Sequence, residues 1–430
     1  MKLFVALLIL GQLLMAATIE YIKIDGLKVP VIFEHDTRLP LVTMQFTFTN
    51  SGSITDTHKA GLAKFSAKLM NEGTKELGSS AFAESLESRA IHISSSTGTE
   101  TFVMEVGSLK EEFNTALEKY GMLLKDPNYT KEAVSKIKTM TLGALSRKEN
   151  DFDYVASNEL KAILFKGTPL GQPSSGTLQS VESIELNDVK SFLESHLTQS
   201  NLIVVLGGDI DLKVAKKKIK KLIKLLPKGK VSAVAHYDVV KTPSESVLYK
   251  QTEQAYIYFG SPYYMAVNDE EYYKARVATF ILGTGGFGSR LMEEIRVKRG
   301  LAYSAYARVH VSKSSSYLTG YLQTKLDSLD EAQKTVKDVI AKFVKKGVTQ
   351  EELEQTKKFL LGSEPLRVET MSQRLNRTFM EYYKGFPLGH SATELEKIQK
   401  LSLEDLNKFI TKHTEINELS FAIVTQAKEQ

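Results

Sequence analysis

Cysteine is absent from this chain of 430 residues, and proline is scarce, at 10 residues. The lack of cysteine excludes disulfide scaffolds, thiol nucleophiles, cysteine-ligated zinc and iron–sulfur clusters. With 27 glycines, the chain is also too poor in glycine and proline for a collagen-like or linker-dominated architecture. Eight histidines are present, but no two lie three to five positions apart, so no helix carries a two-histidine metal clamp.

Basic and acidic residues are present in nearly equal numbers. The chain has 56 basic and 51 acidic residues, a net charge of +5 at pH 7. This excess is small for so long a chain, so charge gives no argument for a nucleic-acid partner. The hydrophobic content of 42% is that of a globular protein with room for two substantial cores.

Residues 1–17 read as a secretory signal peptide. One lysine precedes an apolar stretch, residues 3–15, and two alanines follow it. As a helix this stretch would reach only about 20 Å, too short for a hydrocarbon core of roughly 30 Å. We therefore expect cleavage after Ala16 or Ala17, a periplasmic location and no stable membrane insertion. A buried N-terminal core helix is the alternative.

The rest of the chain divides into two halves with the same order of predicted elements. Thr130 and Thr349 each begin a helical segment that reaches Leu-Gly twelve and thirteen positions later. We interpret this as duplication of an α+β domain, with domains at 18–227 and 243–430 joined by a linker at 228–242. A single larger α/β domain is the alternative.

Several stretches then resemble one family. They are residues 52–74, 168–184, 201–211, 254–257 and, most specifically, LGTGGFGSRLMEEIRVKRGLAYSAYA at 282–307. Together they are similar to the pitrilysin/insulinase family of inverted zinc metallopeptidases, in particular its small two-domain members that work as dimers. The resemblance covers essentially the whole chain after residue 17. It implies two mostly antiparallel sheets flanked by helices, forming half of a clamshell-shaped chamber.

The family's metal site requires H-x-x-E-H on one helix, where two histidines bind zinc and the glutamate activates water. Here Lys64 and Lys68 stand at the histidine positions, and Ala67 stands at the glutamate position. The downstream carboxylate ligand is also missing, since its position falls at residues 142–144, with Ala144 in place of an acid. Ammonium groups repel a dication and offer no lone pair while protonated. We expect no zinc and no family-type hydrolysis from this chain alone.

Two interpretations of the lysine pair remain open. The simpler one is a solvated helix face opposite a buried stripe of Leu62, Phe65 and Leu69. The other is binding of an acidic partner or peptide.

The substrate-binding half of the family's site is retained. The resemblance assigns backbone contacts near the scissile bond to an arginine and a tyrosine seven residues apart, here Arg296 and Tyr303. A guanidinium and a phenol can both donate to a peptide carbonyl. In processing-peptidase relatives a glycine-rich loop faces the substrate, which points to Gly285 and Gly286; a tight helix–helix turn is the alternative.

Two functions follow as hypotheses. The first is a non-catalytic, substrate-binding subunit of a periplasmic heterodimeric zinc endopeptidase, with zinc and an intact H-x-x-E-H on a homologous partner. The second is a structural or peptide-binding module without any role in proteolysis. An autonomous peptidase is the least favoured, because no Ser/His/Asp set is recognisable by local motif.

Overall fold

A computed structural model describes residues 17–427. Two compact units make up the described chain. The first unit contains residues up to 145, residues 173–234 and residues 366–383; the second contains residues 146–172, residues 235–365 and the remainder. Within residues 17–427, no helix is both long and apolar enough to cross a membrane. The predicted signal peptide lies, apart from Ala17, outside the described residues, and β1 begins at Thr18.

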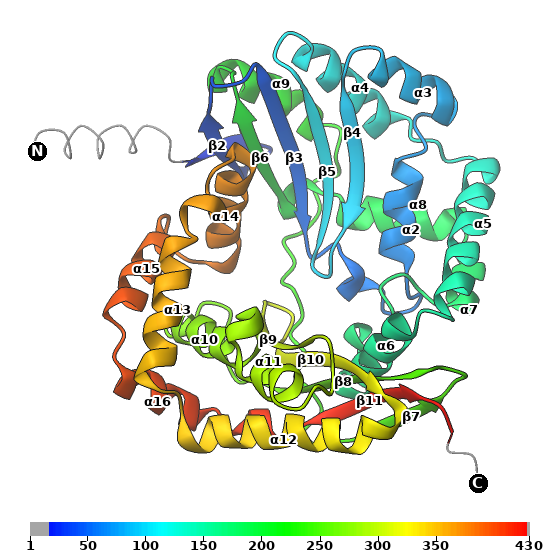
Figure 1. Cartoon of the computed structure of the whole chain (residues 1–430). Coiled ribbons are helices and arrows are strands. Elements are labelled where there is room, and N and C mark those ends of the chain that lie inside the picture. Colours follow the sequence, from blue (N-terminus) through cyan, green and yellow to red (C-terminus); the bar gives the residue numbers. More distant parts are fainter. Residues whose placement is uncertain (1–16, 428–430) are drawn as a thin grey trace, which may run out of the picture. The chain divides into compact units, whose positions relative to one another are not determined.

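The first unit contains a six-stranded sheet (Figure 1). Its strands lie in the order β1 (Thr18–Ile24), β2 (Leu27–His35), β6 (Leu202–Gly208), β3 (Leu41–Thr49), β5 (Thr101–Leu109) and β4 (His92–Thr97). Only the β2–β6 pair is parallel. Its helices are α2 (Leu62–Met70), α3 (Gly78–Glu87), α4 (Phe113–Lys125), α5 (Lys131–Lys148), α7 (Leu178–Glu182), α8 (Leu186–His196), α9 (Leu212–Ile223) and α14 (Met371–Lys384).

The second unit contains a five-stranded sheet. Its order is β7 (Glu245–Tyr249), β11 (Ser420–Thr425), β8 (Gln254–Pro262), β10 (Ser316–Lys325) and β9 (Ala305–Val311). Only β7 and β11 are parallel. Its helices are α6 (Phe152–Leu164), α10 (Tyr272–Thr279), α11 (Arg290–Met292), α12 (Leu329–Lys346), α13 (Gln350–Gly362), α15 (His390–Lys400) and α16 (Leu403–Lys412), with π-helical turns at Phe280–Thr284 and Glu293–Val297.

The two sheets share one topology. Five strands of the first, β2-β6-β3-β5-β4, follow the same order and directions as β7-β11-β8-β10-β9 of the second. Each sheet has its own hydrophobic core against its helices. The predicted fold class, duplicated α+β with mostly antiparallel sheets flanked by helices, is therefore confirmed, and a single large α/β domain is excluded.

Each unit takes one helix from the opposite half of the sequence. Helix α6 precedes the second half but packs on β8 and β11 of the second unit. Helix α14 belongs to the second half but packs on the first unit's sheet, where Leu375 and Tyr383 join a small cluster with residues of β2 and β6. The compact units are therefore discontinuous in sequence. The boundaries at 227 and 243, which describe the duplicated segments, stay a prediction, and residues 228–242 carry no helix or strand.

Candidate functional site

Helix α2 carries the positions at which the family binds zinc, and a buried aspartate fixes where this helix begins. Asp56, 5% exposed, accepts hydrogen bonds from the backbone N–H groups of Gly61 (3.0 Å) and Ala63 (2.9 Å). These bonds satisfy donors that the first turn of a helix otherwise leaves without partners. Burial raises the pKa of Asp56 to about 7, against the opposing effect of the two N–H donors.

The two lysines of α2 are half-buried rather than fully solvated. The Lys64 ammonium donates to the Ser175 hydroxyl at 2.9 Å, and the Lys68 ammonium donates to the Thr141 hydroxyl at 2.8 Å. Of the two open interpretations, a fully solvated helix face does not describe these lysines, and binding of an acidic partner or peptide stays a prediction. Of the predicted buried stripe, Phe65 and Leu69 are buried, whereas Leu62 is only half-buried.

Two glycines place Ser175 beside Lys64. Gly61 has φ +89°, and a Cβ there would lie 2.7 Å from the Gly176 nitrogen. A Cβ on Gly176 would in turn lie 2.6 Å from the Ala60 carbonyl oxygen. The loop before α7 can therefore lie directly against the start of α2 only because both positions lack a side chain.

The α2 residues do not fit a zinc ion. Ala67, at the general-base position, is 3% exposed and carries no proton acceptor, and Ala144 on α5 is half-buried. Two ammonium groups occupy the ligand positions and are directed to hydroxyl oxygens. Within residues 17–427, no group of three histidine, cysteine or acidic side chains could hold a metal ion.

The second unit contains Arg296 on one short helical segment and Tyr303 in the loop after it. Helix α11 and the π-helical turn Glu293–Val297 follow each other directly, and Arg296 lies in the π-helical turn. Its guanidinium carbon lies 4.2 Å from the centroid of the Tyr303 ring and 4.5 Å from that of Phe287. Both rings are within cation–π range, so Arg296 makes contact with two aromatic side chains.

Tyr303 lies in the loop before β9, which begins at Ala305. Its side chain is 81% exposed, and that of Phe287 is 66% exposed. A cavity of about 350 Å³ lies beside Tyr303, with Gln254, Gln323 and Lys325 among its lining residues. Exposed donors next to a polar cavity can receive an extended polar ligand.

The glycine-rich run places Phe287 over Arg296. A Cβ on Gly283 would lie 2.3 Å from the Ala307 nitrogen, so this glycine lets the chain pack against β9. Gly285 closes the π-helical turn through its N–H to the Phe280 carbonyl, and a Cβ there would meet that oxygen at 2.8 Å. Gly286 has φ +62° with open space around it. The run is thus a tight turn between helical segments. Its exposed Phe287 ring contacts the Arg296 guanidinium.

Three residues of these sites were not anticipated. Phe287 lies inside the motif that carried the family resemblance, but only its glycines were singled out. Thr141 and Ser175 are 73 and 111 residues from the lysines they contact, so no local pattern links them. For Thr141 a signal existed, since it directly precedes the segment at 142–144 where the family's carboxylate ligand falls.

Comparison with known proteins agrees with this geometry. Residues 31–178 match the family model described as "Insulinase (Peptidase family M16)", and residues 183–360 match "Peptidase M16 inactive domain". A Helicobacter pylori protein named "Non-peptidase homolog YmxG" is 44% identical over 431 residues, covering 100% of both chains.

Solved structures share the fold. A peptidase M16 inactive domain from Pseudomonas fluorescens superposes with a TM-score of 0.88 at 23% identity, covering 96% of this chain and 99% of that one. A protease from Helicobacter pylori superposes with a TM-score of 0.82 at 16% identity, covering 96% and 100%. With the matching family models and the full-length relative, the conclusion is direct: the chain belongs to the peptidase M16 (insulinase) family.

Proposed function

We propose that this chain is the non-catalytic, substrate-holding subunit of a zinc endopeptidase whose metal and general base lie on a separate homologous chain. One contrast carries the proposal. The residues at the zinc-site positions are lysines and alanines, whereas Arg296 and Tyr303 are present, close together and, in the case of Tyr303, open to solvent.

The zinc-site positions support a chain without hydrolytic activity of its own. Without a ligand set, no metal-bound water can be activated, and Ala67 cannot accept a proton. The name of the Helicobacter pylori relative, a non-peptidase homolog, agrees with this part of the proposal.

The Arg296 region supports a role in holding peptide. A guanidinium and a phenol are both hydrogen-bond donors to a carbonyl oxygen, and they favour the negative charge that develops on it during attack. The polar cavity beside Tyr303 would take a side chain of the same peptide. The tight turn at Gly285 and Gly286 would let the peptide backbone pass close to the chain.

A homologous partner would complete the enzyme. The same species, Helicobacter pylori, has both a non-peptidase homolog 44% identical to this chain and a protease of this fold. We infer that a pair of this kind works together, with the extended peptide pairing to a sheet edge of the catalytic partner. Cleavage of residues 1–17 during export would place the pair in the periplasm.

The test is cleavage of an unfolded polypeptide by the chain co-purified with its H-x-x-E-H homologue. Arg296→Ala should lower kcat/KM of the complex by about 100-fold, because one donor to the developing oxyanion is lost. Arg296→Lys should recover part of the rate by keeping the charge without the planar fork.

Arg89→Ala is the matched control, since Arg89 is an exposed arginine paired with Glu112 at the surface. It should leave the rate unchanged. A complex that cleaves equally well with Arg296→Ala would refute the assigned role. If no homologue with an intact motif co-purifies, the structural or peptide-binding module becomes the better account.

A further inference from the structure

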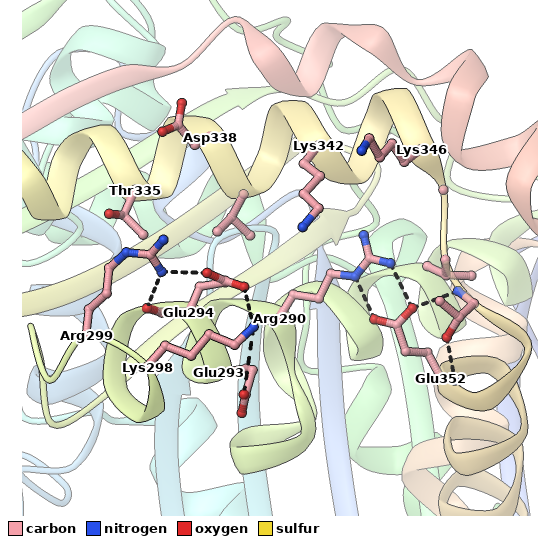
Figure 2. Close-up of a pocket in the computed structure, with 14 residues that line it drawn as sticks. Arg290, Glu293, Glu294, Lys298, Arg299, Thr335, Asp338, Lys342, Lys346 and Glu352 are labelled. Carbon is pink, nitrogen blue, oxygen red and sulfur yellow. Dashed lines mark hydrogen bonds and ion pairs between the residues drawn. The ribbon is translucent and has the colours of Figure 1, made fainter.

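The second unit has a cavity of about 480 Å³ that the proposed function does not use. It is formed by the segment from Arg290 to Arg299, by α12, and by the turn that leads into α13. Its volume falls in the range of small-molecule sites. Val339 and Val348 are among its lining residues, and the rest of the lining is mostly charged (Figure 2).

Two of the acidic side chains that line the cavity already have cationic partners. Glu352 accepts two hydrogen bonds from the Arg290 guanidinium, at 2.6 and 2.7 Å. Glu294 accepts from Lys298 at 2.8 Å and from Arg299 at 2.5 Å. The Lys298 and Arg299 hydrogen bonds lower the pKa of Glu294 to about 2, so one carboxylate faces two cations there.

The α12 side of the cavity adds cations without such partners. Among the described residues, no hydrogen bond or ion pair engages the ammonium groups of Lys342 and Lys346, which lie one helical turn apart. Figure 2 shows Lys342 extending toward the space between Arg290 and Arg299. In the same view the Asp338 carboxylate points away from this space.

The cavity as a whole carries an excess of positive charge. Its lining has five basic residues (Arg290, Lys298, Arg299, Lys342 and Lys346) and four acidic ones (Glu293, Glu294, Asp338 and Glu352). The negative end of α12 and the positive end of α13 both lie at the cavity, so their dipoles offset each other and the side chains decide its preference.

We propose that this cavity binds a small polyanion, a molecule with several phosphate or carboxylate oxygens, with Lys342 as the central contact. Such a ligand would accept hydrogen bonds from the ammonium groups of Lys342 and Lys346. It would also accept from those N–H groups of Arg290 and Arg299 that do not already donate to Glu352 and Glu294. It would also tie the Arg290–Arg299 segment, which carries Arg296, to α12. The proposal does not rest on the subunit role, because the isolated chain can be tested.

The test is isothermal titration calorimetry of the purified chain with sodium tripolyphosphate and, separately, with citrate, at low ionic strength. We expect saturable binding of at least one anion, and comparison of the two anions shows whether phosphate or carboxylate is preferred. Lys342→Gln should weaken the affinity about tenfold, because one charge-assisted hydrogen bond is lost. Lys342→Arg should restore most of it.

Lys345→Gln is the matched control, because Lys345 is an exposed lysine of α12 that does not line the cavity. Hydrogen exchange gives a second measurement, in which the bound anion should slow exchange of the amides of residues 290–299. Lack of binding by both anions would overturn the proposal. So would a loss of affinity in Lys345→Gln equal to that in Lys342→Gln, since binding would then follow surface charge alone.

Discussion

Arg296 owes its position to two aromatic side chains. The guanidinium carbon lies over the rings of both Phe287 and Tyr303, and both residues are largely exposed. Exposed aromatic rings gain little from the hydrophobic effect, so their contact with the guanidinium is what they contribute here. We therefore expect Phe287 to help position Arg296.

Phe287→Ala should lower kcat/KM of the peptidase complex about two- to fivefold, since a cation–π contact at an exposed site is worth roughly 0.5–1 kcal/mol. Phe287→Tyr keeps the ring and should leave the rate unchanged. Steady-state kinetics on a peptide substrate measures both. Equal rates for the alanine variant and the unmodified complex would show that Arg296 needs no such support.

His310 makes the stability of the second unit depend on pH. Burial lowers the pKa of this imidazole to about 4, and the positive charges of Arg308 and Lys161 add to the effect. Its ring is stacked on Tyr317, with centroids 4.6 Å apart. The folded state therefore holds a neutral histidine, whereas the unfolded chain takes up a proton near pH 6.5.

The stabilisation that the neutral His310 gives is fully present above pH 6.5. It is lost as the pH falls toward 4, because the unfolded state then binds more protons than the folded state. Between pH 6.5 and pH 4 the free energy of unfolding should fall by about 3 kcal/mol more for the unmodified chain than for His310→Gln. Urea unfolding at pH 7, 6, 5 and 4 measures the difference, and parallel curves for the two proteins would contradict it.

At the level of elements, α14 is fastened to the first unit by a buried charge. Arg374 donates to Glu34 at 2.5 and 2.8 Å and to Asp36 at 3.0 Å, and Glu34 is only 1% exposed. Burial raises the pKa of Glu34 even though Arg374 opposes the shift. Removing either Arg374 or Glu34 alone should therefore destabilise the fold, because the remaining partner would be left without its counter-charge.

Arg374→Met should lower the free energy of unfolding by about 3–5 kcal/mol, because it leaves Glu34 buried without its cation. Adding Glu34→Gln to this variant should recover part of the loss. The control is Arg89→Met, since the Arg89 side chain is 52% exposed and should change the free energy by less than about 1 kcal/mol. Urea denaturation that places both single variants at the same stability would contradict the assignment.

The elements show where sequence patterns suffice and where they do not. The alternating run at 41–49 predicts β3 because one face of that strand is buried and the other is not. Strand β7 could not be predicted in this way, since its five residues are partly buried or exposed without alternation. The exchange of α6 and α14 could not be predicted, because it depends on which sheet each helix meets after the chain has folded.

The sites divide in the same way. The family motif predicts Arg296 and Tyr303 from a spacing of seven residues, and the structure brings their side chains together. The hydroxyl partners of Lys64 and Lys68 come from distant segments, so local patterns carried no information about them. The charges of Lys64 and Lys68 suggested that this face of α2 is exposed to solvent. The loop before α7 packs against the start of the helix, and both lysines are half-buried.

On the scale of the whole molecule, a duplicated fold is conserved while the chemistry of its two halves differs. The sheets keep the same strand order and directions. In the first unit the positions that the family motif gives to metal and base hold lysine and alanine, and in the second Arg296 and Tyr303, which we propose as donors to a peptide, lie in contact. In this account the chain holds a substrate that a homologous subunit cleaves.

The most direct measurement is zinc content and peptide cleavage for residues 18–430 purified alone and together with the H-x-x-E-H homologue. We predict no zinc and no cleavage for the chain alone, and one zinc ion per heterodimer with cleavage for the pair. Stoichiometric zinc on the isolated chain, with turnover to match, would contradict the account.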